Sequence, residues 1–209
     1  MNCAVGKQLL VCAWSVLYFV AVGNLYCQMQ NTPPTTGDSI VYLALGSNLG
    51  DRRANLAAAV EQLRAQVTIE AISSLYETKP AYLRDQPRYL NAALCGRTQL
   101  EPPALLVFLK RIERDLGRVA GPRFGPRVID LDILLYDDLV LDTDELTIPH
   151  PRMAERPFVL VPLAEIAPGL APPGWTTTVG SMAGAIRGHG DVIAMVGRLD
   201  QPSDAGQEA

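Results

Sequence analysis

The sequence predicts one α+β domain of the ferredoxin-like kind, an antiparallel sheet with helices on one face. Apolar runs of strand length alternate with segments of helical periodicity in the order β-α-β-β-α-β. The chain has 209 residues, of which 48% are hydrophobic. That is enough for one well-buried domain and leaves no room for a second large one.

We place this domain at residues 39–190, between an N-terminal apolar segment and leader at 1–38 and a C-terminal tail at 191–209. The apolar run Leu9–Val22 would form a helix of roughly 21 Å, short of the ~30 Å hydrocarbon core of a bilayer. We therefore expect no membrane association.

Three interpretations of the first segment stay open. It is a signal-like segment with a small-residue cleavage site at Ala21–Gly23, a targeting or packing element, or sequence ahead of a true start at Met29. We favour Met29, because a polar, proline-rich stretch follows it. From there on Cys95 is the one cysteine, so no internal disulfide forms, and we expect a cytoplasmic monomer.

The first half of the domain predicts three strands and a helix. Ile40–Leu45 is an apolar, β-branched-rich run that predicts a buried strand. A helix follows, with Asp51 or Asn48 as its cap. Strands are also predicted at Val67–Leu75 and Tyr89–Arg97. The apolar positions of the helix are Leu56, Ala59, Val60 and Leu63.

The polar loop Tyr76–Arg88 is long for a hairpin, and loops of that length without structure of their own are often binding elements. Pro102 opens a second helix, on which Lys110 and Glu113 lie off the apolar stripe and therefore on a solvated face. The stripe consists of Leu105, Phe108, Leu109, Ile112 and Leu116.

Further along, a Gly/Pro/Arg loop at Gly117–Arg127 leads into a strand. We expect a short helix or turn at Pro157–Glu165, an amphipathic helix at Thr178–Arg187, and a disordered end from Gln201.

The strand after that loop carries the most informative pattern. Side chains alternate across a strand, so Asp130 and Asp132 share one face. Two carboxylates that close repel unless a cation lies between them, and Mg²⁺ favours one or two carboxylates plus substrate phosphates. The sequence therefore predicts a magnesium site. The residues expected on the opposite, core-facing side are Ile129, Leu131, Ile133 and Leu135.

Cations flank the acidic pair on both sides, as a polyphosphate would require, since guanidinium groups bind phosphate oxygens in a bidentate manner. The alternative is that these arginines simply pair with the two aspartates at a surface; the clustering favours a functional site. The flanking residues are Arg118, Arg123, Arg127, His150, Arg152 and Arg156.

The overall charge excludes a general nucleic-acid binder. The net charge is −4, the pI is near 5.2, and aromatic residues make up 6% of the chain. An RNA-binding ferredoxin-like module would need a basic face and exposed stacking aromatics. We therefore expect small-molecule substrates and no nucleic acid.

Several separate blocks, taken in order, resemble the 6-hydroxymethyl-7,8-dihydropterin pyrophosphokinase family over Ile40 to about Ala185. These blocks are Leu45–Gly50, Tyr76–Thr78 with Pro80, Asp85–Pro87, Tyr89–Ala92, Ile112–Glu113, Gly117–Arg118, Gly125–Asp132 and Ile148–Met153.

The resemblance implies transfer of pyrophosphate from ATP, the co-substrate, to the hydroxymethyl group of the pterin, with AMP released, two Mg²⁺ required and a role in folate biosynthesis. It implies that Asp130 and Asp132 bind metal. It implies catalytic roles for Arg118, Arg127, Asp130, Asp132 and His150. It implies ATP contacts for Lys110, Arg118, Arg127, Thr147, His150 and Arg156, and pterin contacts for Thr78, Tyr89, Asn91, Phe124 and Phe158. The general base is left open between His150 and an aspartate.

The chain departs from the family pattern at several positions. Ala120 stands where an arginine is common, so one phosphate contact is expected to be missing, and Lys110 replaces a frequent glutamine. Tyr82 stands in place of a usual glycine, Phe124 in place of a tryptophan, and Ala154 in place of a histidine.

A metal-dependent sugar-nucleotide transferase is the alternative function, because it too uses an Asp-x-Asp pair. It leaves the Tyr89–Asn91 and Ile148–His150 blocks unexplained.

Overall fold

The computed structural model describes residues 37–83, 85–119, 121, 124–186 and 192–200, all of which fall in one compact unit. The predictions for the N-terminal segment, Ala120, Arg123, Arg187 and the chain from Gln201 lie outside the described residues. Within the described ranges, no helix is long and apolar enough to cross a bilayer.

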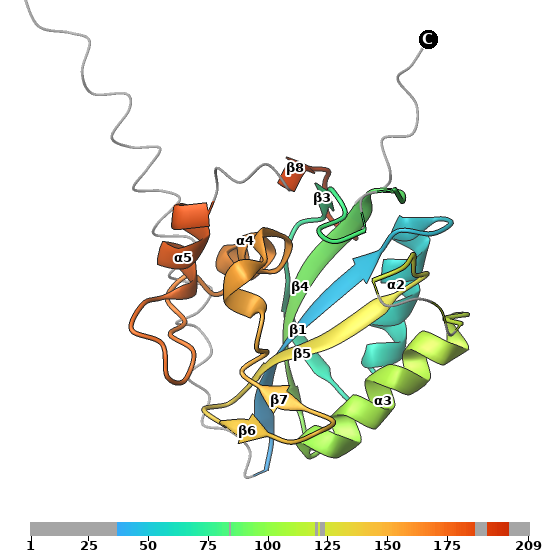
Figure 1. The fold of residues 1–209 in the computed structure, drawn as a ribbon. Helices are drawn as coiled ribbons and strands as arrows, with labels where there is room; N and C mark the ends of the chain where they lie inside the picture. Colours follow the sequence, from blue (N-terminus) through green and yellow to red (C-terminus); the bar gives the residue numbers. More distant parts are fainter. Residues whose placement is uncertain (1–36, 84, 120, 122–123, 187–191, 201–209) are drawn as a thin grey trace, which may run out of the picture. The chain divides into compact units, whose positions relative to one another are not determined.

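A six-stranded antiparallel sheet forms the centre of the domain (Figure 1). Its order is β5-β1-β4-β3-β8, and β2 also pairs with β4. The α+β class with an antiparallel sheet is confirmed. The strands are β1 (Ser39–Ser47), β2 (Thr68–Ile72), β3 (Tyr76–Thr78), β4 (Tyr89–Thr98), β5 (Asp130–Tyr136) and β8 (Val192–Met195), and a separate hairpin joins β6 (Leu141–Asp142) to β7 (Thr147–Ile148).

Helices cover both faces of the sheet, whereas the sequence predicted one covered face. Figure 1 shows α2 (Arg52–Leu63) and α3 (Pro102–Asp115) on one side, and α4 (Pro157–Ile166) and α5 (Val179–Ile186) on the other. Asp51, one of the two predicted caps, caps α2 by accepting a hydrogen bond from the Ala54 amide at 3.0 Å.

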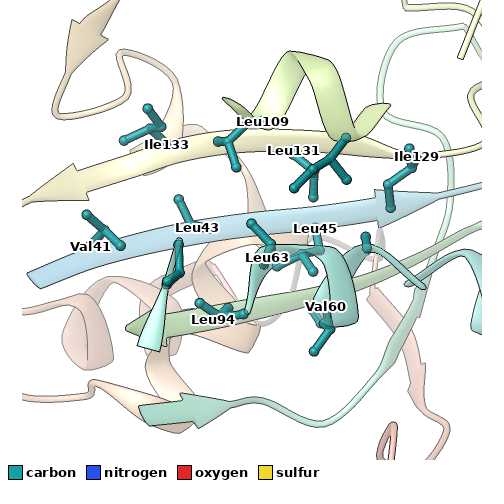
Figure 2. Packing of buried hydrophobic residues seen from close by; sticks show 14 of the residues in the cluster. Val41, Leu43, Leu45, Val60, Leu63, Leu94, Leu109, Ile129, Leu131 and Ile133 are labelled. Carbon is teal, nitrogen blue, oxygen red and sulfur yellow. The ribbon is translucent and has the colours of Figure 1, made fainter. Parts of the chain in front are cut away.

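The two layers enclose separate cores because side chains alternate along the strands. On the α2/α3 side, Leu43, Leu45 and Leu131 pack with helix residues such as Leu63 and Leu109 (Figure 2). On the α4/α5 side, neighbouring strand positions such as Ala93 pack against α4. The same sheet face therefore holds an apolar layer and, as described below, the polar site.

The alternation of β5 reverses within the strand. Leu131 and Ile133 face the α2/α3 core as predicted, but Leu135 lies in the α4/α5 core together with Leu134. The register with β1 shifts between Tyr42 and Leu43, and Leu134 is skipped. A skipped residue of this kind reverses the side-chain phase, so the prediction for Leu135 was wrong about the face.

Two short strands of the central sheet were not predicted. The segment interpreted as the loop Tyr76–Arg88 begins with β3, which pairs with β4 on one side and β8 on the other. Strand β8 lies in the stretch that we interpreted as a C-terminal tail, so the sheet extends beyond residue 190. Both strands are too short for periodicity to indicate them.

Candidate active site

Three neighbouring strands bring the main polar residues into one row. In the sheet, Gly46 of β1 lies opposite Asn91 of β4 and opposite Asp130 of β5. Two residues along β1, Ala44 lies opposite Asp132. Directly opposed residues on antiparallel strands lie about 5 Å apart and point to the same face, so small residues of β1 separate the amide of Asn91 from the two carboxylates.

A cavity of about 280 Å³ opens over this row, on the sheet face that also carries α4. It brings together ten of the thirteen predicted site residues: Thr78, Tyr89, Asn91, Phe124, Arg127, Asp130, Asp132, His150, Arg156 and Phe158.

The other three predicted site residues do not line the cavity. Arg118 pairs with Asp130 directly, and Lys110 is connected to Arg118 through their shared partner Glu113. Thr147 lies on β7, where its hydroxyl donates to Asp142 at 3.1 Å.

Asp130 is paired with arginine in this state. Its Oδ1 accepts hydrogen bonds from Arg127 at 2.7 Å and from Arg118 at 2.8 Å. Burial raises the pKa of this carboxyl, but the charges of Arg127, Arg118 and Lys110 outweigh burial and hold the pKa below its ordinary value. Asp130 is therefore ionised at neutral pH. Burial likewise lowers the pKa of Arg127, but Asp130 outweighs it, so the net shift is upward.

A buried carboxylate, Glu113, supports these arginines from behind. Its side chain is 2% exposed, so the predicted solvated face was wrong for this residue. Glu113 Oε1 pairs with Arg118 at 2.5 Å and Lys110 at 2.9 Å, and it accepts from the Leu131 amide at 2.8 Å. Arg118 and the Leu131 amide lie outside α3, so the apolar stripe of the helix did not reveal that Glu113 is buried.

His150 is held as a neutral imidazole. The backbone amide of Arg152 donates to His150 Nδ1 at 3.2 Å, which leaves the proton of the neutral ring on Nε2. Burial lowers the pKa of His150; Asp132 opposes the shift, and Arg156 and Arg152 reinforce it. The ring therefore acts as a hydrogen-bond donor through Nε2.

The amide of Asn91 is fixed from two sides. Its Nδ2 donates to the Thr78 hydroxyl at 2.7 Å, and both residues are buried. A Cβ at Gly46 would lie 2.8 Å from Asn91 Oδ1, so only glycine leaves room for the amide there. Nearby, the Tyr89 hydroxyl donates to the Gly125 carbonyl at 3.4 Å, and burial raises the pKa of that phenol.

Aromatic and cationic side chains form a further wall of the cavity. Tyr82 and Phe124 stack with ring centroids 4.3 Å apart and an interplanar angle of 27°. The Arg152 guanidinium lies 5.3 Å from the Phe124 ring centroid, and that of Arg156 lies 5.5 Å from the Phe158 centroid. Phe124 has a φ of 63°, a conformation uncommon for a non-glycine residue and often found at functional sites.

Asn48, one of the two predicted helix caps, instead ties two loops to the turn after β1. Its Oδ1 accepts from the Arg127 amide at 2.7 Å, and its Nδ2 donates to Gln86 at 3.1 Å and to the Pro87 carbonyl at 3.2 Å. Gln86 in turn donates to the Phe124 carbonyl at 3.1 Å. The walls of the cavity are thereby joined.

The sequence assigned no site role to several residues that the structure brings to the cavity. Gly46 and Gln86 belong to motif blocks, and Arg152 and Tyr82 were noted only as a flanking cation and a departure. Position inside a motif block was the available signal for Gly46, Gln86 and Arg152, whereas Tyr82 lies between blocks.

An antiparallel α+β sheet that presents paired carboxylates, arginines and a neutral histidine to one cavity is typical of a class, namely enzymes that act on phosphate-bearing substrates. The chain belongs to the 7,8-dihydro-6-hydroxymethylpterin-pyrophosphokinase family, whose model matches residues 42–168. The resemblance inferred from the separate motif blocks is confirmed.

Two named relatives support the family assignment. The chain is 50% identical over 131 residues to 2-amino-4-hydroxy-6-hydroxymethyldihydropteridine pyrophosphokinase of Bacillus subtilis, covering 62% of this chain and 78% of that protein. It is 50% identical over 137 residues to folic acid synthesis protein FOL1 of Dictyostelium discoideum, covering 66% of this chain but 21% of that much longer protein. The chain thus spans about a fifth of the latter's length.

A solved structure supports the fold. A triple mutant of Plasmodium falciparum HPPK-DHPS superposes with a TM-score of 0.61 at 16% identity, over 71% of this chain and 43% of that one.

Replacing Glu113 with glutamine tests whether its buried negative charge stabilises the protein through Arg118 and Lys110. The amide keeps an acceptor for the Leu131 amide but loses the charge that Arg118 and Lys110 require. We expect the free energy of unfolding in urea to fall by about 1–3 kcal/mol. Glu61→Gln is the matched control, since Glu61 is 80% exposed and its ion pair within the described residues is with the exposed Arg64, and it should change stability by less than about 0.5 kcal/mol. Equal stability of the two variants would contradict the role of Glu113.

The lowered pKa of His150 predicts a pH dependence of stability. Between the folded pKa of His150 and the ordinary value of 6.5, the unfolded chain binds more protons than the folded protein. The free energy of unfolding therefore falls as the pH is lowered through this range. The contribution of His150 is complete above pH 6.5 and is lost as the pH falls from there through the folded pKa. Urea unfolding of the unmodified chain and His150→Asn between pH 5 and 8 should show their stability difference shrinking toward low pH. A difference that is constant with pH would contradict this assignment.

Proposed function

We propose that this chain transfers the terminal pyrophosphate of ATP to the hydroxymethyl oxygen of 6-hydroxymethyl-7,8-dihydropterin, releasing AMP, as a step of folate biosynthesis. The observation that carries the proposal is the strand register, which aligns Asn91, Gly46 and Asp130 in one cavity. Membership of the family supports the reaction.

The pterin occupies the end of the cavity near Asn91. The Asn91 side chain, oriented by Thr78, reads the polar edge of the heterocycle. Phe124 and Phe158 supply flat surfaces for stacking, and Tyr89 packs beside them on the same sheet face as Asn91. Aromatic rings stack on a flat heterocycle at low entropic cost, because they have few rotatable bonds.

The triphosphate occupies the end near the arginines. Arg127 and Arg156 line the cavity and bind phosphate oxygens, and His150 donates from Nε2. Arg118 and Lys110 contribute from behind Asp130, within the Glu113 network. Thr147, on β7, is the predicted ATP contact with the least support from this geometry.

Asp130 and Asp132 fit a magnesium site. Both carboxylates line the cavity, and among the described residues no group of three His, Cys, Asp or Glu side chains converges that could hold a metal by itself. Such a pair suits Mg²⁺ whose remaining ligands are water and substrate phosphates. When bound, the two expected ions would neutralise the phosphate oxygens and help to orient the β-phosphorus.

The remaining residues position the reactants. The hydroxyl oxygen must approach the β-phosphorus in line, and catalysis of this kind is mainly positioning and charge neutralisation. Because His150 Nδ1 accepts the Arg152 amide, His150 carries its proton on Nε2 and acts as a donor. The general base is then an aspartate, and Asp132 is our choice, since Oδ1 of Asp130 is occupied by two arginines.

The sugar-nucleotide alternative has no support from the family match, which covers residues 42–168 and thus the blocks that it leaves unexplained. We further propose that the protein works as a cytoplasmic monomer without nucleic-acid or membrane partners.

The reaction predicts a specific product. The full chain with ATP, Mg²⁺ and the pterin should produce AMP, and no ADP, only when the pterin is present. Asp130→Ala and Asp132→Ala should each lower kcat by more than about 100-fold, since each removes a group that neutralises transition-state charge. Chromatographic separation of AMP from ADP measures both effects.

Asp144→Ala, on an exposed loop away from the cavity, is the control and should keep full turnover. ADP as the product, or AMP formation independent of the pterin, would refute the proposed reaction.

Gly46→Ala tests whether the Asn91 amide hydrogen-bonds to the polar edge of the pterin. The new Cβ would push the Asn91 amide from its position, so that one neutral hydrogen bond to the pterin would be lost. The Kd of the pterin should therefore rise at least about tenfold. Calorimetry with the pterin, and separately with an ATP analogue, should show a loss for the pterin alone.

Gly184→Ala serves as the control, because an added Cβ there meets nothing within 4 Å. Unchanged pterin affinity in Gly46→Ala would exclude Asn91 from the pterin site.

A further inference from the structure

Tyr82 contacts both ends of the cavity at once. Its ring stacks on Phe124 at 4.3 Å, and its hydroxyl accepts a hydrogen bond from Arg156 Nε at 3.2 Å. The Arg156 guanidinium lies 5.7 Å from the Tyr82 ring centroid and 5.5 Å from that of Phe158. The side chain thus connects a proposed pterin wall to a proposed phosphate ligand.

These contacts occupy the surfaces that a bound heterocycle needs. Phe124 already has an aromatic partner in Tyr82, and Phe158 already has Arg156 over its ring. Arg152 lies over both Tyr82 and Phe124, at 5.5 and 5.3 Å from their centroids. A flat substrate that stacks on the covered faces of Phe124 and Phe158 must therefore displace Tyr82, Arg156 or both.

We propose that Tyr82 is a positioning residue that couples the two substrates: it covers the Phe124 face while Arg156 holds its hydroxyl, and it leaves when a triphosphate draws Arg156 away. This inference rests on the proposed function for the identity of the two ligands. Tyr82 is 44% exposed and belongs to no core cluster, so it moves without disturbing the fold.

Thermodynamic linkage gives the direction in which each substrate should change the affinity for the other. With the ring in place, the pterin must compete with Tyr82 for Phe124, so its affinity is lowered by the strength of one aromatic pair, between about twofold and tenfold. A nucleotide that engages Arg156 removes the hydrogen bond and raises pterin affinity. By reciprocity, the pterin raises nucleotide affinity by the same factor.

Tyr82→Ala and Tyr82→Phe separate the two contacts. Calorimetric titration of the full chain with 6-hydroxymethyl-7,8-dihydropterin alone should give Tyr82→Ala an affinity about twofold to tenfold higher than that of the unmodified chain. Magnesium and a methylene-bridged ATP analogue should then raise pterin affinity less in Tyr82→Ala than in the unmodified chain. Tyr82→Phe keeps the ring but loses the hydroxyl, so it should lie between the two. Val140→Ala, 68% exposed and away from the cavity, should match the unmodified chain.

Equal or weaker pterin binding by Tyr82→Ala without nucleotide would overturn the proposal, because Tyr82 would then be a wall of the bound state. A measurement without pterin distinguishes failure of the proposed Tyr82 coupling from failure of the proposed pyrophosphate transfer. In calorimetry without pterin, Tyr82→Ala should bind the ATP analogue with Mg²⁺ about twofold to tenfold more tightly than the unmodified chain, because no hydrogen bond between Tyr82 and Arg156 has to be broken. Equal or weaker binding of the analogue by Tyr82→Ala would overturn the coupling, whereas absence of pterin-dependent AMP from the unmodified chain would refute only the proposed function.

Discussion

The register of β1 between β4 and β5 is the constraint on which the site depends. Because Gly46 lies opposite both Asn91 and Asp130, three strands deliver a hydrogen-bonding amide and a carboxylate to one sheet face. A slip of β4 by one residue would turn Asn91 into the α2/α3 core, and a slip of β5 would do the same to Asp130. The apolar packing of Leu43, Leu45 and their neighbours on the opposite face therefore fixes the functional residues as well as the fold.

The charges of the site depend on burial behind it. Glu113 is inaccessible to solvent, and the ion pairs it makes with Arg118 and Lys110 keep those cations at the back of Asp130. In turn, Arg127, whose charge has the largest opposing effect, and these two cations keep Asp130 ionised despite its burial. A carboxylate that remains charged in a partly dry site is what a divalent cation requires. The helix α3 thus supports the chemistry without contributing a wall to the cavity.

Local patterns predicted much of this structure, and non-local contacts account for what they missed. The alternation in β5 predicted that Asp130 and Asp132 share a face, which their joint lining of the cavity confirms. The burial of Glu113 depends on Leu131 and Arg118, which no helical period reports. The reversal at Leu134 arises from a register shift against β1, and a single strand's sequence carries no trace of its partner's register.

Asn48 connects the walls of the cavity to one another through hydrogen bonds. Its neighbour Asp51 caps α2, which leaves the Asn48 side chain available to bond the Gln86–Pro87 loop and the Arg127 amide. Gln86 extends the connection to the Phe124 carbonyl, and Phe124 stacks on Tyr82. A displacement of either loop must therefore stretch bonds to the turn after β1. Since β1 also sets the spacing between Asn91 and Asp130, the positions of the aromatic wall and of the acidic pair are linked through one buried amide side chain.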